Sequence, residues 1–158
     1  MALSYDRAMN FAEAMREELR RRQRANPGYS LRAFARDLGI SHSALSRLAR
    51  GLGHVSQSTL KRVAKRLRWT PAMAAQVAVA DAVDRVVLSI GRRTFVADAR
   101  WIASQANLPL DAVQLAIHEG LRRRRFSMTS PQRWQVNVVR PSRRVARPGP
   151  RSSRTGRE

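Results

Sequence analysis

Residues 31–50 constrain the fold of this chain more than any other stretch, because their pattern suits two short helices joined by a tight turn. Ala35 is a small residue at the position where the two helices would cross closely. Gly39 stands where the turn needs a positive φ, which glycine adopts without strain. Ser41 can cap the second helix by accepting a backbone N–H hydrogen bond. The segment is therefore predicted to be a helix-turn-helix, with one apolar face made of Phe34, Leu38, Ile40, Leu45 and Leu48.

The same helical phase turns a polar and basic set of side chains outward from the second helix. A surface of this kind suits the major groove of DNA. We expect base readout from His42, Ser43, Ser46 and Arg47. We expect phosphate contacts from Ser30, Arg32, Arg50, Ser56 and Lys61. The alternative is an ordinary pair of helices in a helical protein, with no role in binding DNA.

The charge of the chain points to a polyanionic partner. There are 31 Lys and Arg against 11 Asp and Glu, a formal net charge of +20 in 158 residues. Residues 30–70 hold +8 of this charge, more than any other segment that is predicted to fold. Such an excess favours a polyanion, because neutralising phosphates releases counterions, but it does not separate DNA from RNA or from an acidic membrane. Of the 31 cations 29 are Arg, which suits bidentate contacts to phosphate and guanine but also follows from a GC-rich genome.

What the sequence lacks disfavours other classes of protein. It has no Cys, hence no disulfide framework, thiolate nucleophile or Cys-based zinc site. No apolar run approaches the roughly 18 to 20 residues of a membrane span, and the first residues lack the pattern of a signal peptide. The His residues fall on different predicted elements without metal-ligand spacing: His42, His54 and His118. We therefore expect a cytoplasmic, nucleoid-associated protein that is not an enzyme and has no cofactor or metal.

Further helices are predicted on both sides of the motif. Residues 8–25 form the first, and its apolar side chains repeat at helical spacing: Phe11, Met15 and Leu19. The arginine run at 20–24 is interpreted as a solvated helix face, with phosphate contact as the second choice. Asn26, Pro27 and Gly28 end this helix. Ser30 and Ser56 are the expected caps of two later helices, and the helix at about 57–68 has a buried face of Leu60, Val63, Ala64 and Leu67.

Residues 8–69 resemble the Cro/C1 repressor class, in which four or five helices surround a helix-turn-helix. Proteins of that class usually bind DNA as dimers. The Ala- and Val-rich stretch at 71–91 follows directly. We expect it to form a buried connecting helix, with a homodimer seam as the alternative.

A weaker copy of the motif is found at residues 99–117. Ala103 takes the crossing position and Asn107 the left-handed turn, for which Asn is the next best residue after Gly. The apolar set of this copy is Ile102, Ala106, Leu108, Val113 and Ile117. Alternation then predicts a hairpin with a turn at 129–132, its apolar positions being Phe126, Met128, Trp134, Val136 and Val138. This order of elements is a winged-helix layout.

The second helix of this copy suits base readout poorly. Asp111 and Glu119 would repel phosphates, and Pro109 stands where a capping hydroxyl is expected. Gln114 and His118 are its only obvious candidates for contacts to base edges. We interpret the second module as structural or protein-binding, although the arginines at 122–125 could contact a DNA backbone beside it.

The order of the parts is similar to that in a family of predicted bacterial transcriptional regulators, which have a Cro/C1-type helix-turn-helix followed by a winged-helix module. The resemblance rests on residues 29–39, 45–47 and 98–103 and covers roughly residues 5–128. Members of the family tend to be longer after the second module, where this chain has an Arg/Pro/Ser-rich tail. The resemblance implies transcription regulation and supplies no ligand or target.

We therefore predict a mainly α protein in three parts. Residues 1–70 are a Cro/C1-like helix-turn-helix bundle, and 71–139 are a connecting helix and a small winged-helix-like module with a C-terminal β-hairpin. Residues 140–158, with seven Arg and three Pro, are too polar to fold and should form a disordered tail. The predicted function is sequence-specific regulation of transcription on double-stranded DNA. An RNA-binding basic protein and an antitoxin-like protein-interaction regulator are the alternatives.

Overall fold

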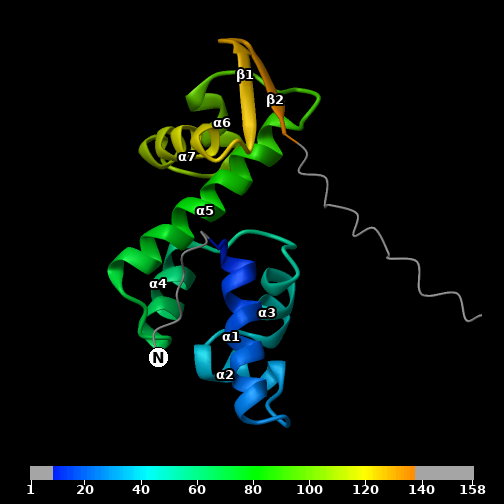
Figure 1. Cartoon of the computed structure of the whole chain (residues 1–158), viewed down its shortest axis with the longest axis vertical. Helices are drawn as coiled ribbons and strands as arrows, with labels where there is room; N and C mark the ends of the chain where they lie inside the picture. The colour runs from blue at the N-terminus through cyan, green and yellow to red at the C-terminus, as the bar shows by residue number, and fades with distance from the viewer. Residues whose placement is uncertain (1–8, 138–158) are drawn as a thin grey trace, which may run out of the picture.

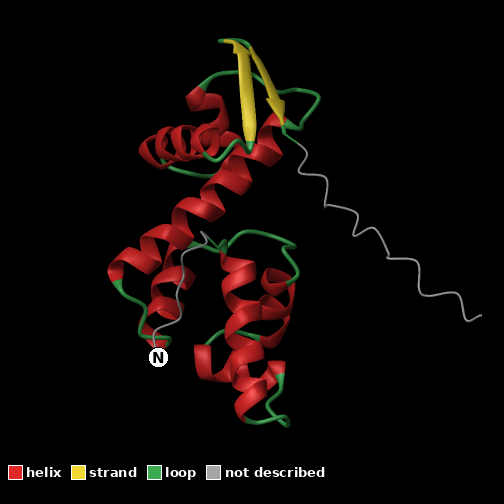
Figure 2. Cartoon of the chain, in the orientation of Figure 1, coloured by secondary structure: helices red, strands yellow, loops and turns green. Residues whose placement is uncertain are grey.

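The computed structural model describes residues 9–137, which form seven helices and one antiparallel hairpin (Figures 1 and 2). The helices are α1 (Phe11–Ala25), α2 (Leu31–Leu38), α3 (His42–Ala49), α4 (Gln57–Arg66), α5 (Pro71–Ile90), α6 (Ala99–Ala106) and α7 (Leu110–Arg122). The strands are β1 (Phe126–Ser130) and β2 (Arg133–Val136). The predicted mainly α fold with a hairpin after the last helix is confirmed.

Two apolar cores lie toward opposite ends of the molecule, and the long helix α5 joins them (Figure 1). The N-terminal core unites α1 to α4 with Val77 of α5, and its largest buried side chains are Phe11, Met15, Phe34, Leu38 and Leu45. The C-terminal core unites the rest of α5 with α6, α7 and the hairpin, and its members include Val83, Val86, Ile102, Val113 and Phe126. The stretch at 71–91 thus forms a connecting helix that is buried along one face from Val77 onward, whereas its first two turns and Leu88 are largely exposed, and the homodimer seam stays a prediction.

The predicted caps form as expected. Ser30, Ser41 and Ser56 each accept a hydrogen bond from the backbone N–H three residues later. α1 begins at Phe11 after an Asn10 capping box, and residue 8, where we predicted its start, lies outside the described residues. The prediction for α4 was too long by two residues, because Leu67 caps the helix and Arg68 turns to a φ of 53°.

The hairpin differs from the predicted one at its turn. β1 continues through Thr129 and Ser130, which we assigned to the turn, so that only residues 131–132 separate the strands. The register pairs Phe126 with Val136 and Met128 with Trp134. The Trp134 ring stacks on the buried Phe126 ring, and this attaches the hairpin to the C-terminal core. Val138 and the tail lie outside the described residues.

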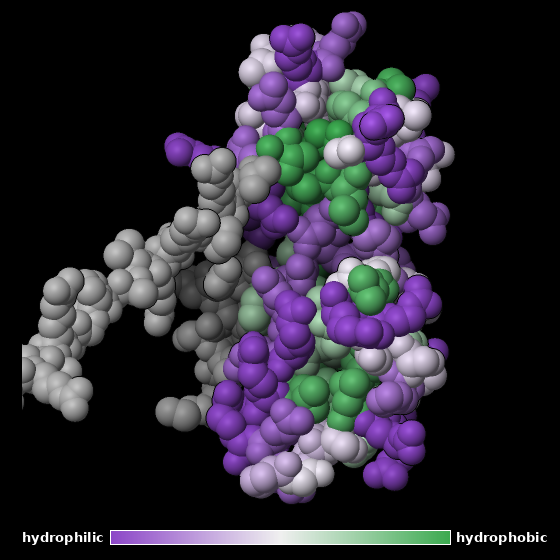
Figure 3. All heavy atoms as spheres, turned by 90° about the vertical axis from the view of Figure 1, so that its right-hand side faces the viewer, coloured by the Kyte–Doolittle hydropathy of each residue, from purple (hydrophilic) through white to green (hydrophobic). Residues whose placement is uncertain are grey.

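The face of the molecule in Figure 3 is mostly hydrophilic, with apolar patches on both its upper and lower halves. Among residues 9–137 the exposed large apolar side chains are Leu52, Leu88, Val96, Leu110, Leu115 and Met128. In this same part of the chain, no helix is long and apolar enough to cross a bilayer.

A buried arginine on α5 holds the two ends of the protein together. Arg85 Nη2 donates a hydrogen bond of 2.6 Å to the carbonyl of Val55, which precedes α4. Arg85 Nη1 donates one of 3.4 Å to the carbonyl of Ala106, the last residue of α6. Arg85 Nε pairs with the Asp81 carboxylate at 2.9 Å. The side chain therefore ties backbone from both cores to the helix that joins them.

Asp84 makes a second connection on the same helix. One carboxylate oxygen accepts a hydrogen bond of 2.6 Å from Asn10 Nδ2 at the start of α1. The other accepts a hydrogen bond of 2.7 Å from Arg125 Nη2, just before β1. The two acids that interrupt the apolar pattern of α5 thus face the junction between the cores.

We expect Arg85→Met to lower the free energy of unfolding by about 3–5 kcal/mol, because it leaves Asp81 buried without its counter-ion. Burial already raises the pKa of Asp81, against the opposing effect of Arg85. Urea denaturation measures the change, with Arg93→Met in an exposed loop as the control. The double variant Asp81→Asn, Arg85→Met should recover part of the loss. A loss equal to that of the control would show that Arg85 does not hold the junction.

Candidate nucleic-acid interface

α3 presents the side chains that we predicted to read bases. His42, Ser43 and Arg47 are exposed, and Ser46 is half-buried. On the opposite side Leu45 is fully buried and fixes the helix in the N-terminal core. Ser43 and Arg47 are one turn apart on the outer face, since they are separated by four residues. The structure therefore brings the four predicted readout residues together on one short helix.

The cations of α3 also contact the protein itself. Arg50 Nε donates 3.2 Å to the Ser46 carbonyl, which leaves the outer nitrogens of its guanidinium for a ligand. The guanidinium of Arg47 lies beside the loop after α3, where a Cβ added to Gly53 would meet Arg47 Nη2 at 3.5 Å. Both arginines thus rest on well-defined backbone while their charges stay at the surface.

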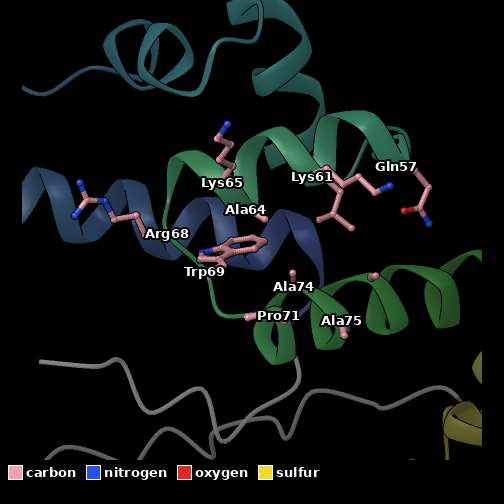
Figure 4. Close-up of a pocket in the computed structure, with 11 residues that line it drawn as sticks. Gln57, Lys61, Ala64, Lys65, Arg68, Trp69, Pro71, Ala74 and Ala75 are labelled. Atoms are coloured by element: carbon pink, nitrogen blue, oxygen red, sulfur yellow. The ribbon is translucent and has the colours of Figure 1, made fainter.

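The residues predicted to contact phosphate are spread over three helices. Ser30 and Ser56 are the N-caps of α2 and α4, where free backbone N–H groups and the helix dipole favour an anion. Arg32 is exposed on the first turn of α2 and has no ion-pair partner among residues 9–137. Lys61 lies apart from this group, in the wall of a groove between α4 and α5 (Figure 4).

The turn between α2 and α3 has the conformation that the sequence predicts. Gly39 adopts φ 68° and ψ 34°, in the left-handed region. Its carbonyl accepts a hydrogen bond of 2.9 Å from Arg62 Nη1 of α4. At the C-terminal end of α3, Arg16 Nη1 of α1 donates a hydrogen bond of 2.8 Å to the Ala49 carbonyl. These two arginines contact the turn before the readout helix and the last residue of that helix, and sequence reasoning missed them because their partners are 23 and 33 residues away.

A polar cluster braces the end of α1 against α2. Arg22 Nη1 donates a hydrogen bond of 2.7 Å to the Tyr29 hydroxyl and another of 2.8 Å to the Asp37 carboxylate. Tyr29 also donates a short hydrogen bond to Asp37. Burial and this hydrogen bond raise the pKa of Tyr29, and the same bond lowers the pKa of Asp37. Arg22 lies over the Phe34 ring, 5.1 Å from its centroid. It therefore serves the fold of the domain.

The other arginines of the run at 20–24 also meet carboxylates. Arg20 and Arg24 pair with Glu17, and Arg21 and Arg22 pair with Glu18. Burial pushes the pKa of Glu18 up, but its hydrogen bonds and charge contacts with the two arginines outweigh this and hold the pKa below its usual value. The run is a helix face laced with ion pairs, as the first of our two interpretations favours.

The weaker motif copy folds as a second helix pair. Asn107 adopts φ 50° and ψ 53° between α6 and α7, and Pro109 caps α7 without a side-chain hydrogen bond. Ile102, Ala106 and Val113 are buried as predicted.

The charged residues at the end of α7 differ from our expectation. Glu119 is half-buried and accepts hydrogen bonds from Arg122 and Arg123, with Arg122 lowering its pKa most, to about 2. Arg125 pairs with Asp84. Glu119 is thus neither fully exposed nor unpaired, contrary to our expectation, and contact of the arginines at 122–125 with a DNA backbone stays a prediction.

No group of three or more His, Cys, Asp or Glu side chains is placed to hold a metal ion in the described part of the chain. The three His residues lie on α3, in the loop before α4 and on α7. Burial lowers the pKa of His54, and the nearby charge of Arg85 adds to this.

Residues 21–72 match the model of the helix-turn-helix family, which covers about a third of the chain. The match runs from the second half of α1 to the start of α5. This segment is thus a helix-turn-helix DNA-binding domain. It is of the Cro/C1 type, with α2 and α3 as the motif helices. No curated protein and no solved structure matches the chain.

We expect Gly39→Ala to lower the free energy of unfolding by about 1–2 kcal/mol, the cost of a left-handed conformation for a residue with a Cβ. Gly39→Val should cost more, because a β-branched residue is strongly disfavoured there. The added Cβ has room, since its nearest neighbour would be Arg62 Cδ at 3.7 Å, so the cost is one of backbone strain. Thermal melts followed by circular dichroism measure it. Gly28→Ala, at a glycine without a left-handed φ, is the control; equal melting temperatures for all variants would contradict the strain.

Proposed function

We propose that this protein is a sequence-specific transcriptional regulator that reads the major groove of double-stranded DNA with α3. The observation that carries the proposal is the exposed polar face of α3, within a Cro/C1-type domain that holds +8 of the net charge over residues 30–70. The second helix of such a motif places its outer side chains against base edges. The cations around this face would attract the phosphates of the DNA backbone to the same surface.

Each residue of the interface has a distinct role in this proposal. Arg47 can donate hydrogen bonds to both O6 and N7 of a guanine. The Ser43 hydroxyl can either donate a hydrogen bond to a base edge or accept one from it. His42 and Ser46 lie beside them on α3. The remaining contacts, which position the domain on the phosphate backbone, come from Ser30, Arg32, Arg50, Ser56 and Lys61.

The proposal also covers the location of the protein, its oligomeric state and its lack of enzymatic activity. We infer a regulator without enzymatic activity that works in the cytoplasm, associated with the nucleoid, and has no cofactor. We also infer that two copies bind a two-fold symmetric site, since Cro/C1-type proteins usually bind as dimers. The second module, with its hairpin as the wing, is proposed to have a structural or protein-binding role.

RNA binding is the main rival, and the packing of the aromatic side chains speaks against it. Single-stranded RNA is commonly held by bases stacking on exposed aromatic rings. Here Phe95, Trp101, Phe126 and Trp134 pack against one another, and Phe11 and Phe34 are buried, whereas Trp69 is the exception and stays half-buried beside α4. A gel shift that compares duplex DNA, single strands and RNA decides between the two; preference for RNA would overturn the proposal.

We expect Arg47→Ala to weaken binding to the preferred duplex by about 1–3 kcal/mol and to relax specificity at one base pair. The duplex is first selected from a random library, and affinities are then measured by fluorescence anisotropy. Arg100→Ala, which removes the same charge from α6, is the control and should have little effect on specificity. Equal weakening on all sequences would make Arg47 a backbone contact, and no change would mean that another helix reads the bases.

We expect deletion of residues 140–158 to weaken binding to preferred and random duplexes by similar factors. The seven Arg in this segment can meet phosphates in many arrangements, none of which fixes a base-edge geometry. The slope of log affinity against log salt should become shallower by about 0.9 for each phosphate that the shortened chain no longer neutralises. Loss of preference for one site would instead make the tail a minor-groove reader. No change in affinity or slope would mean that the tail does not touch DNA.

A further inference from the structure

An open groove runs between α4 and α5, on a part of the domain that the proposed DNA contacts use only at Lys61 (Figure 4). Its volume is about 630 Å³. The lining is apolar at its base, where Leu60 and Ala64 of α4 face Ala74 of α5. The ring of Trp69 lies between the two helices near one end of the groove (Figure 4).

Local structure explains why the groove stays open. The chain turns tightly after α4, with the Trp69 backbone N–H donating 2.9 Å to the Ala64 carbonyl. Thr70 then caps α5, which begins at once with Pro71. The wall that α5 gives to the groove consists of Pro71 and three alanines, which are too small to fill the space opposite Leu60. A half-buried Trp beside small residues leaves apolar surface for another chain.

The rim of the groove is basic and carries no compensating acid. Lys61 and Lys65 lie one turn apart on α4, and Arg68 follows them in the turn after the helix. Residues 57–78 contain no Asp or Glu. Within residues 9–137 none of these three cations forms an ion pair, whereas the arginines of α1 and the end of α7 mostly do.

We propose that this groove is the docking site for an acidic amphipathic helix of a partner protein. Apolar side chains at three- and four-residue spacing would enter the groove beside Trp69. Carboxylates along the flank of that helix would meet Lys61, Lys65 and Arg68. α4 has ten residues, about 15 Å at a helical rise of 1.5 Å, so roughly three turns of the partner fit along it.

Charge makes a second copy of this chain a poor occupant. Self-association through the groove would bring the same three cations near each other, in a protein with 31 cationic and 11 acidic residues. The acidic residues of α1 do not offer a matching surface, because Glu17 and Glu18 already pair with arginines of their own helix and Glu13 accepts from the Asn10 backbone N–H in the capping box. The phosphate backbone of a duplex would satisfy the rim but would leave the apolar base and Trp69 without a counterpart, because the bases of a duplex are already stacked on one another.

The test titrates the full chain, without DNA, against fluorescein-labelled helical peptides at physiological salt. One peptide of 14 residues carries leucines at helical spacing flanked by glutamates. A second has the same leucines flanked by lysines, and a third has the residues of the first in shuffled order. We expect the first peptide to bind at least about tenfold more tightly than the other two, which is about 1.4 kcal/mol.

Two variants test whether the peptide binds in the groove. Lys65→Glu reverses one charge of the rim, and Ala75→Trp fills the groove from an exposed position of α5. Each variant should lower the affinity for the acidic peptide by about tenfold, as is typical of residues at the centre of an interface. Arg93→Glu and Ala72→Trp, outside the groove, are the matched controls and should not change binding.

Other results would overturn the proposal. Equal affinity for the shuffled peptide, or no effect of Ala75→Trp, would reduce the interaction to non-specific charge attraction. A chain that sediments as a dimer and becomes a monomer on Ala75→Trp would assign the groove to a second copy. Because no DNA is present, failure of the peptide to bind leaves the proposed DNA readout untouched, and loss of DNA readout would not remove the groove.

Discussion

The structure depends on the placement of one buried guanidinium. Arg85 brings a full positive charge into the junction between two apolar cores, where desolvation would be costly without Asp81 and two backbone carbonyls. The carbonyls belong to segments 21 and 30 residues away along the chain, one from each core. Loss of any of these partners would leave part of the buried charge uncompensated, so the side chain favours the arrangement of the cores in which all of them are present.

The parts of the structure that sequence reasoning found are those decided within a few residues. Caps such as Ser41 and turns such as Gly39 depend on local backbone geometry, and the apolar faces follow from helical spacing. The polar contacts that orient α3 were not found, since Arg16 and Arg62 reach backbone far along the chain. A signal for Arg85 did exist: it is the one cation in an Ala- and Val-rich helix, four residues after Asp81. The grouping of the readout residues on one helix was predictable, whereas the position of Lys61 in a groove wall required the packing of α5 against α4.

Formal charge and available charge are distributed differently over this protein. The arginines of α1 and the end of α7 are largely neutralised by neighbours on their own helices. Residues 30–70 contain a single acid, Asp37, and it pairs with Arg22 of α1. The field that a polyanion meets is therefore concentrated on α2 to α4 more strongly than the sequence total of +20 implies.

The continuity of α5 has a mechanical consequence. Its 20 residues span about 30 Å and contain no Gly or Pro after the first position, so the helix lacks the usual sites of a kink. Its first half packs against α1 and α4, with the groove left open beside α4, and its second half packs more extensively against α7. A helix without such sites keeps the two cores at a fixed spacing along its axis.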